Sequence, residues 1–316
     1  MQNDGRGGHR PKSNRRLVFD MGRRVLVTGS EGFTGRYVCQ ALVKAGWEVW
    51  GSGVAKDGSS SPYIRLNVLE PDSIKNALSK AQPHVVIHLA AISFAAETDP
   101  SRYYNVNLLG TRNLLSGLSC MDRTPEQVIL ASSANVYGNS DQIKLAETCS
   151  AKPENDYAIS KLGMELLSNV FKNRLNISIT RPFNYTGVGQ NDRFLIPKIV
   201  SHVKRRAPFI ELGNVEVERD FSDVRDIARY YVALAESNKA AGLINFCSGR
   251  SVSLKSILQI AAERSGHVMR VSVTPRLKRE QEVFRLLGDR GKLDKIASER
   301  IDFDIDSTIE WMLAAP

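Results

Sequence analysis

The sequence predicts an α/β protein: a doubly wound parallel sheet followed by a smaller α/β lobe. Two observations lead to this prediction. Short apolar runs alternate with helix-patterned segments between residues 24 and 182, which is the pattern of repeated βαβ units. From residue 183 onward the alternation becomes irregular, and short extended pieces are mixed with helices. The second half is therefore expected to form a lobe of its own, with some segments returning to the large sheet.

The strands expected in the sheet are short. The run at residues 85–89 is apolar throughout, which is typical of a parallel strand buried on both faces. The other strands of the first half are expected at residues 24–28, 48–51, 63–66, 127–131 and 177–180. Helices are expected at residues 33–44, from residue 71, at 100–119 and 156–172, and later near 192–206, 223–237, 253–264 and 305–313.

The composition is that of an ordinary globular protein. Hydrophobic residues make up 42% of the 316 positions and charged residues 24%. No stretch approaches the about 20 apolar residues of a membrane span, and residues 1–20 lack the apolar run of an export signal. The four cysteines are scattered without a CxxC pair, so we expect reduced thiols in a cytoplasmic protein with no metal site.

The net charge of +9 raises the question of nucleic-acid binding. Residues 1–20 carry five basic and two acidic residues, a net +3, and are too polar to bury a core. We expect them to form a disordered basic tail. The remaining +6 contains no basic run interleaved with aromatic residues. A basic cleft for a diphosphate explains this charge as well as nucleic acid does, and the motifs below favour the diphosphate.

A glycine-rich loop lies between the first expected strand and the first expected helix. Gly29 allows a tight turn, and Gly32 lets the backbone approach a pyrophosphate closely. Gly35 lets the helix pack against the sheet, and Phe33 opens that helix, whose free N–H groups and positive dipole end attract an anion. The loop predicts a dinucleotide site.

The choice between NAD and NADP depends on the end of the second strand. An enzyme that uses NAD usually places an acidic residue there to hold the ribose 2′-OH. Here no acid follows Val49 until Asp57, while Lys56 and Arg36 are near enough in sequence to meet a 2′-phosphate. The sequence therefore favours NADP (NADPH), and NAD stays possible.

A reactive pair is expected on the helix at 156–172. Tyr157 and Lys161 are four residues apart and so share one helix face. A cation one turn away lowers the pKa of a phenol, which otherwise ionises near pH 10. Such a tyrosine passes a proton to or from a carbonyl or alcohol oxygen. Ser133, at the carboxyl end of an expected strand, could hydrogen-bond to the same oxygen.

Together these motifs resemble the extended short-chain dehydrogenase/reductase family, of the NAD-dependent epimerase/dehydratase type, over residues 22–316. The glycines match its TGxxGxxG motif, and residues 88–91 (His-Leu-Ala-Ala) match its strand beside the cofactor. The resemblance implies a Rossmann sheet and adds Ala90 and Ala91 to the cofactor-binding residues. It also assigns Ser133, Tyr157 and Lys161 as the catalytic set, with Lys161 also holding the cofactor ribose.

The second half resembles nucleotide-sugar enzymes of this family. Residues 181–190 resemble their RPFNxTGPGQ segment, which implies that Asn184 contacts the sugar diphosphate and Lys198 lies beside the nucleotide base. Residues 211–226 resemble their LGN…RDFxDVRD segment, which implies that Arg219 pairs with the diphosphate, as suits a guanidinium. Arg279 is a candidate second phosphate contact.

Within the family, this arrangement most resembles the GDP-6-deoxy-4-keto-D-mannose reductases, which make GDP-rhamnose. A 4,6-dehydratase needs an acid–base group after Ser133, where this chain has Ala134 and Asn135. The implied reaction is reduction of the 4-keto group of a nucleotide-activated 6-deoxyhexose, with hydride from NADPH and a proton from Tyr157. The alternative is an NAD-dependent nucleotide-sugar 4-epimerase, and a non-catalytic cofactor-binding regulator is less expected because both Tyr157 and Lys161 are present.

The expected organisation follows from these assignments. Residues 21–182 are expected to bind the dinucleotide, joined by a returning segment near 222–248. Residues 183–221 and 249–316 are expected to bind the nucleotide sugar. The family resemblance also implies a homodimer formed through the helices at 100–119 and 156–172. No nucleic-acid or membrane partner is expected.

Overall fold

The structure, a computed structural model, describes residues 22–316 except 59–61, 94–97, 238–240, 275–283 and 298–302. Two predictions, the basic tail at residues 1–20 and the phosphate contact at Arg279, lie outside the described residues. Among the described residues, no helix is both long enough and apolar enough to cross a membrane.

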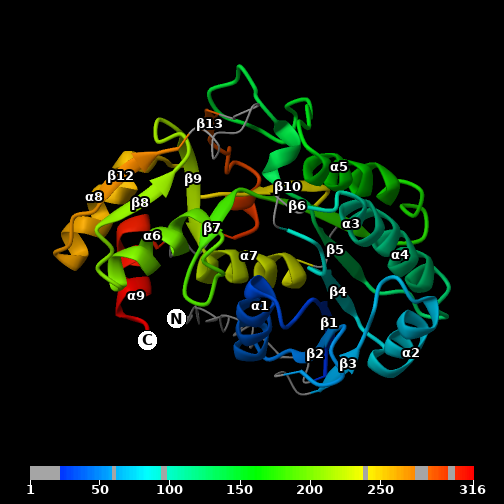
Figure 1. The fold of residues 1–316 in the computed structure, drawn as a ribbon. Helices are drawn as coiled ribbons and strands as arrows, with labels where there is room; N and C mark the ends of the chain where they lie inside the picture. The colour runs from blue at the N-terminus through cyan, green and yellow to red at the C-terminus, as the bar shows by residue number, and fades with distance from the viewer. Residues whose placement is uncertain (1–21, 59–61, 94–97, 238–240, 275–283, 298–302) are drawn as a thin grey trace, which may run out of the picture.

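The large sheet has seven parallel strands, which confirms the predicted doubly wound fold (Figure 1). Their order is β10-β6-β5-β4-β1-β2-β3, so the chain starts at the centre and winds outward in both directions. The strands are β1 (Arg24–Thr28), β2 (Glu48–Gly53), β3 (Tyr63–Arg65), β4 (Val85–His88), β5 (Gln127–Ala131), β6 (Ile177–Pro182) and β10 (Leu243–Phe246). Because all of them are parallel, the ends of β1, β4, β5 and β6 meet at one edge.

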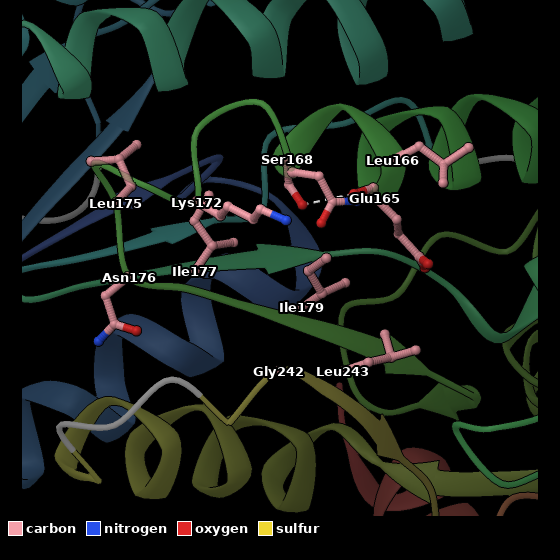
Figure 2. A pocket seen from close by; sticks show the side chains of 11 residues that line it. Glu165, Leu166, Ser168, Lys172, Leu175, Asn176, Ile177, Ile179, Gly242 and Leu243 are labelled. Carbon is pink, nitrogen blue, oxygen red and sulfur yellow. Dashed lines mark hydrogen bonds between the residues drawn. The ribbon is translucent and has the colours of Figure 1, made fainter.

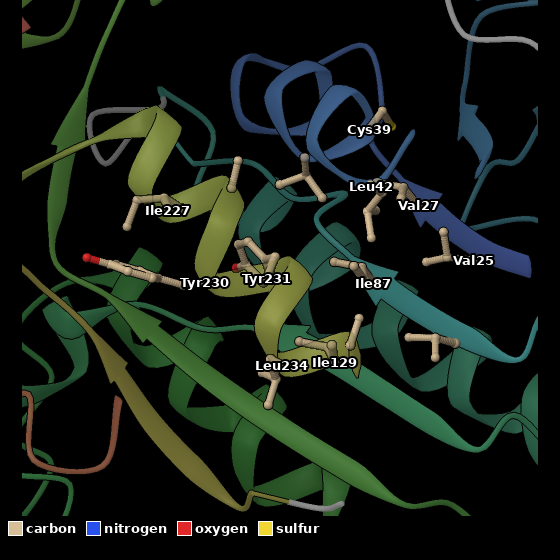
Figure 3. Close-up of a cluster of buried hydrophobic side chains, with 14 of the residues drawn as sticks. Val25, Val27, Cys39, Leu42, Ile87, Ile129, Ile227, Tyr230, Tyr231 and Leu234 are labelled. Carbon is tan, nitrogen blue, oxygen red and sulfur yellow. The ribbon is translucent and has the colours of Figure 1, made fainter. Parts of the chain in front are cut away.

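Helices cover both faces of this sheet. α1 (Phe33–Lys44) and α7 (Val224–Glu236) pack on one face, where Leu42, Tyr231 and Leu234 meet Val27 and Ile87 (Figure 3). The opposite face is covered by α2 (Pro71–Ala81), α4 (Thr111–Ser119) and α5 (Asp156–Ser168). The helix α7 comes from the second half of the chain, as does β10, so both return to the large sheet.

The segment predicted as one helix at residues 100–119 is not a single α-helix. It consists of α3 (Ser101–Tyr103), a π-helix η1 (Tyr104–Gly110) and α4. The wider π-helical turn includes Asn107, which is 2% exposed and makes contacts described below. Short π-helical stretches are frequent at functional sites, and this one lies beside the proposed reactive helix, since η1 and α5 are in contact.

The remaining elements all come from the second half of the chain, where a separate hydrophobic cluster joins α6, α8 and α9. They are β7 (Asn184–Thr186), α6 (Leu195–Lys204), β8 (Phe209–Leu212), β9 (Glu218–Asp223), β11 (Ser251–Ser253), α8 (Leu254–Ser265), β12 (Arg270–Val273), β13 (Arg285–Leu286), η4 (Leu293–Lys295) and α9 (Ile305–Ala314). β9 pairs with β7, β11 and β13, and β8 pairs with β12.

Arg225 joins α9 to the start of α7. Its guanidinium lies 3.6 Å from the ring centroid of Phe303 and 3.8 Å from that of Trp311. It also donates to both oxygens of Asp223, at 2.9 and 2.7 Å. Thr308 of α9 donates to the same buried carboxylate at 2.8 Å. The end of the chain is thereby tied to the element that returns to the large sheet.

Replacing Arg225 should therefore destabilise the protein, and a variant that loses both the ion pair with Asp223 and the aromatic stacking should be less stable than one that loses the stacking alone. Arg225→Leu leaves the Asp223 carboxylate buried without its cation, and we expect a loss of about 2 to 3 kcal/mol in the free energy of unfolding. Arg225→Lys keeps the charge but loses the planar stacking, and should cost about 1 kcal/mol. Urea denaturation of the two variants measures this order; equal stability of both variants would contradict it.

Candidate functional site

The glycine loop has the geometry of a closely packed phosphate cradle. Gly29 has a φ of 71°, and a Cβ at this position would lie 2.9 Å from the backbone nitrogen of Ala90. The structure thus brings Gly29 and Ala90 together, as the motifs predict. Gly32 precedes the first turn of α1 as its N-cap residue, and no side chain caps that turn. The first-turn N–H groups therefore remain suited to an anion.

Substitution at Gly35 should abolish this cradle. A Cβ there would lie 2.2 Å from the carbonyl oxygen of Gly29 and 2.7 Å from Cα of Ser30, so the loop would have to move. We expect Gly35→Ala to cost about 1 to 3 kcal/mol of stability and to weaken NADPH binding severely. Gly163→Ala is the matched control, because its Cβ meets Leu108 only at 3.5 Å. Wild-type NADPH affinity in Gly35→Ala, measured by fluorescence titration, would contradict the assignment.

A chain of buried hydrogen bonds fixes this loop to the neighbouring strand and helix. Oγ1 of Thr28 lies 2.7 Å from Nδ1 of His88, and Nε2 of His88 lies 3.0 Å from Oγ1 of Thr111. Burial lowers the pKa of His88 to about 3, so the ring is neutral and has a structural role here. Thr111 in turn donates to the carbonyl oxygen of Asn107 at 2.7 Å.

Asn107 extends this chain to the reactive helix. Its Oδ1 accepts from the backbone N–H of Ile92 at 2.8 Å, and its Nδ2 donates to Oγ of Ser160 at 3.1 Å. Ser160 donates to the carbonyl oxygen of Tyr157 at 2.7 Å. The segment after β4, which contains Ala90 and Ala91, is thus held against α5. The motifs in the sequence did not single out Thr111 or Ser160.

Ser133, Tyr157 and Lys161 lie together at the end of β5. They are 8%, 7% and 5% exposed, and Ser133 is hydrogen-bonded to the hydroxyl of Tyr157. Nζ of Lys161 donates to the carbonyl oxygen of Ala131 at 2.8 Å. The ring of Tyr103 meets that of Tyr157 edge-on, with centroids 5.9 Å apart. Two features of the sequence, the YxxxK pair and the serine, therefore converge on one place.

The acid–base character of Tyr157 differs from the prediction. Burial raises its pKa to about 12, and the hydrogen bond with Ser133 only partly opposes this. Burial lowers the pKa of Lys161 to about 8, which the carboxylate of Glu165 partly offsets. The predicted lowering of the phenol pKa is wrong for this structure, because burial raises the pKa by more than the neighbouring groups lower it. Tyr157 is a protonated phenol throughout the neutral range.

Three of the predicted substrate residues lie on the second lobe. Asn184 on β7 pairs in register with Phe221 on β9, two residues beyond Arg219, so Asn184 and Arg219 lie on paired strands. Nδ2 of Asn184 is buried without a hydrogen-bond partner among the described residues, which suits a group that binds a ligand. Arg219 donates to the carbonyl oxygens of Glu218 and Phe284 at 2.9 and 3.1 Å.

Lys198 lies on α6 and reaches the neighbouring LGN segment. Its Nζ donates to the carbonyl oxygen of Glu211 at 2.7 Å, so the two segments that the resemblance assigned to one nucleotide are adjacent. Its placement beside a base stays a prediction.

The two lobes meet through Tyr185, which the sequence did not single out. Its hydroxyl lies 2.7 Å from Oγ1 of Thr34, and its ring stacks on Phe33 with centroids 6.1 Å apart. Tyr37 donates to the carbonyl oxygen of Val188 at 2.8 Å, which adds a second link. The first turn of α1 therefore contacts the strand that carries Asn184, so the expected cofactor and substrate residues adjoin.

Comparison with known proteins identifies the family. The model of the NAD dependent epimerase/dehydratase family matches residues 25–246, from β1 to the end of β10. The chain belongs to this family. Its fold and the glycine loop are those of NAD(P)-binding members, and the chain is an NAD(P)-dependent enzyme that modifies nucleotide sugars.

Two curated relatives cover most of the chain. GDP-6-deoxy-D-talose 4-dehydrogenase of Aggregatibacter actinomycetemcomitans is 33% identical and covers 85% of this chain and 90% of its own length. GDP-6-deoxy-D-mannose reductase of Pseudomonas aeruginosa is 30% identical and covers 93% and 97%, respectively.

Three solved structures share the fold at full length. A protein from Burkholderia cenocepacia, to which an epimerase role has been provisionally ascribed, has a TM-score of 0.86 and 45% identity, covering 92% of this chain and 97% of its own. RMD from Pseudomonas aeruginosa complexed with NADPH has a TM-score of 0.81 and 29% identity, covering 93% and 97%. UDP-glucose 4-epimerase of Thermus thermophilus in complex with NAD has a TM-score of 0.81 and 25% identity, covering 92% and 97%.

Proposed function

We propose that this enzyme reduces the 4-keto group of a nucleotide-activated 6-deoxyhexose, specifically GDP-4-keto-6-deoxy-D-mannose to GDP-rhamnose. The observation that carries the proposal is the buried contact between Ser133 and a protonated Tyr157. Two groups that can both donate a proton to one oxygen suit the reduction of a ketone, in which that oxygen gains negative charge. The residues after Ser133 in the short helix η2 (Ala134–Tyr137) begin with Ala134 and Asn135, which cannot supply the further acid–base step of a dehydratase.

Each side chain has a defined task in this proposal. Tyr157 donates its proton to the C4 oxygen, and Ser133 polarises the carbonyl through a hydrogen bond. Lys161 holds the cofactor ribose. Asn184 and Arg219 bind the diphosphate, with Lys198 beside the base. The dinucleotide is assigned to residues 21–182 with the returning segment near 222–248, and the nucleotide sugar to residues 183–221 and 249–316.

The residues present fit a nicotinamide cofactor, since a Cβ would fill the cradle at Gly29 and Gly35. When bound, the cofactor supplies the hydride. We propose NADPH because β2 ends in Gly51-Ser52-Gly53 and so carries no carboxylate of its own for the ribose 2′-OH. Arg36 is exposed on the first turn of α1 and is available to a 2′-phosphate. NADH should therefore be the poorer cofactor.

The names of the relatives support the choice of sugar. 6-Deoxy-D-talose and 6-deoxy-D-mannose differ only in configuration at C4, so the sugars in the names of the two curated relatives share one 4-keto form. A shared 4-keto-6-deoxy sugar linked to GDP is the substrate most consistent with both. The configuration of the product depends on which face of the ketone the pocket exposes.

A 4-epimerase that uses NAD is the second candidate. The similarity to the Burkholderia protein and to UDP-glucose 4-epimerase favours it. An epimerase would use Ser133, Tyr157 and Lys161 in the same roles. We favour the reductase because the two curated relatives that cover most of the chain are named for GDP-linked 6-deoxy sugars.

The proposal is tested by following NADPH absorbance when the enzyme is given GDP-4-keto-6-deoxy-D-mannose, with NADH and UDP-galactose assayed in parallel. We expect rapid consumption of NADPH only with the GDP-linked ketosugar. Chromatographic comparison of the product with GDP-6-deoxy-D-mannose and GDP-6-deoxy-D-talose then gives its configuration at C4. Interconversion of UDP-galactose and UDP-glucose without net cofactor consumption would establish the epimerase instead.

We also propose that the enzyme is a cytoplasmic homodimer that pairs through η1 and α5. Four large apolar side chains are exposed on these elements and the turn that follows α5: Leu109, Ile159, Leu166 and Val170, at 48%, 44%, 63% and 74%. Such a patch is typical of an interface. Sedimentation equilibrium should give twice the chain mass of 35.0 kDa, and Ile159→Glu should shift it toward the monomer.

A further inference from the structure

The contact between α5 and the end of β5 continues beyond the residues proposed for the chemistry. Ser132, which lies between Ala131 and Ser133, donates its hydroxyl hydrogen to Oε1 of Glu165 at 2.5 Å. Glu165 follows Lys161 by one helical turn, so positions 157, 161 and 165 form one stripe on α5. At the end of β5, Ala131 thus contacts Lys161, Ser132 contacts Glu165, and Ser133 contacts Tyr157.

Arg181 on β6 holds Glu165 from the other side. Its Nε donates to Oε1 at 2.9 Å and its Nη2 donates to Oε2 at 2.6 Å, a bidentate pair between side chains that are both buried. The same guanidinium lies 4.6 Å from the ring centroid of Tyr137, the last residue of η2. The segment that carries Ser133 is therefore held at both ends, at Ser132 through Glu165 and at Tyr137 through Arg181.

The network also borders open space on its outer side. Glu165 and Ser168 of α5, with Ile177 and Ile179 of β6, line a hollow of about 430 Å³ between helix and strand (Figure 2). A buried ion pair in such a position is weak evidence for stability alone, because the desolvation of both charges opposes their attraction. Its position behind the reactive helix is better explained by a role in placing that helix.

We propose that Glu165 is a positioning residue: clamped by Arg181, it sets the register of α5 against the end of β5 and so holds Tyr157 and Lys161 at the reacting oxygen. This inference rests on the proposed function for its kinetic consequences. Glu165 does not touch the reacting atoms. It acts through Ser132 and through its charge on Lys161.

The charge of Glu165 has a consequence for Lys161. Burial disfavours the ammonium form, and the carboxylate of Glu165 opposes this effect. Glu165→Gln would remove that opposition and leave Arg181 as an unpaired buried cation nearby. Both changes favour the neutral form of Lys161, so its pKa should fall below the present value of about 8.

Other ionisable groups around this part of α5 do not replace Glu165. The tyrosines on the elements around the stripe are Tyr103 of α3, Tyr104 of η1, Tyr137 of η2, Tyr185 of β7 and Tyr231 of α7. The basic residues on these elements include His88 of β4, Arg102 of α3, Arg112 of α4 and Arg181 of β6. Tyrosine hydroxyls are neutral at pH 7, and His88 is neutral as shown above. Among these groups of the described chain, Glu165 is therefore the anion that faces Lys161.

The test compares Glu165→Gln, Glu165→Asp and Ser132→Ala with the wild type. Asp226→Asn is the matched control, because Asp226 is another nearly buried carboxylate, paired with Arg229 on α7 and remote from the stripe. Each variant is assayed for kcat, KM and their pH dependence with GDP-4-keto-6-deoxy-D-mannose, and for thermal stability.

We expect Glu165→Gln to lower kcat about a hundredfold with KM nearly unchanged, because misplacement of the reacting groups by about 1 Å has an effect of this size. The fall of activity at high pH should move down by about one pH unit. In Glu165→Asp the negative charge is kept, so activity should fall at the same high pH as in the wild type. Its kcat should still be about tenfold lower than that of the wild type. Asp226→Asn should lose stability but keep the kcat and the pH dependence of the wild type.

A Glu165→Gln enzyme whose kcat and pH profile match those of Asp226→Asn would overturn the inference. If Glu165→Gln does not fold, Ser132→Ala decides: kcat about three- to tenfold low at wild-type stability supports positioning, and unchanged kcat overturns it. If the wild type turns over no nucleotide sugar, the proposed function fails separately. The pH dependence of NADPH binding then tests Glu165, since loss of the Lys161 charge should weaken binding at a lower pH in Glu165→Gln, and an unshifted dependence contradicts the inference.

Discussion

Tyr157→Phe is expected to lower kcat about a thousandfold, because a positioned proton donor contributes about 10² to 10⁴ in rate. The variant keeps the ring that packs edge-on against Tyr103 and loses only the hydroxyl bonded to Ser133. The fold and the glycine loop are untouched, so NADPH should bind with wild-type affinity. Steady-state kinetics and a fluorescence titration of NADPH together measure both effects.

Tyr104→Phe is the control for this experiment. Its hydroxyl donates to Asp156 at 2.6 Å, one residue before Tyr157, but lies outside the proposed chemistry. Removing it should leave kcat within about threefold of wild type, as for most surface changes. Near-normal turnover by Tyr157→Phe would refute the catalytic assignment, whatever the control shows.

Lys161→Met is expected to have the second largest effect. The variant fills the same space but loses the ammonium group, so we expect kcat to fall about a hundredfold. NADPH affinity should fall about tenfold or more, as for loss of a charged hydrogen bond.

The wild type provides a check on the same residue. Lys161 is protonated below its pKa of about 8 and loses its charge as the pH rises through that value. Turnover that depends on the charged form should therefore decline above about pH 8, and the decline should be missing from Lys161→Met. If turnover of Lys161→Met declines at the same pH and by the same factor as that of the wild type, the decline is due to another ionisable group.

The sheet and most helices could be predicted from the sequence, because the spacing of apolar residues along each element matches the positions that are buried in the fold. The predicted helix at residues 33–44 matches α1, since its buried positions recur every three or four residues. The π-helix at Tyr104–Gly110 was not predictable in the same way. Its wider turn depends on contacts of Asn107 with Ile92 and Ser160, residues distant in sequence, and leaves no mark in the hydrophobic pattern.

The site was predictable in its residues but not in its electrostatics. The spacing of Tyr157 and Lys161 shows that they share a helix face, but not how deeply that face is buried or that the ammonium group bonds to Ala131. Glu165 illustrates the same limit. A glutamate four residues after a lysine usually indicates an exposed helical ion pair, and only the approach of Arg181 and Ser132 from two strands makes it a buried clamp.

The central claim, that the enzyme reduces a 4-keto sugar, is tested most directly with NADPH deuterated at the transferred position. The enzyme is incubated with GDP-4-keto-6-deoxy-D-mannose, and the GDP-linked product is analysed by mass spectrometry and NMR. The account predicts one deuterium per product molecule, located at C4, with one NADPH oxidised for each. Sugar interconversion with no deuterium in the product and no net oxidation of NADPH would contradict it.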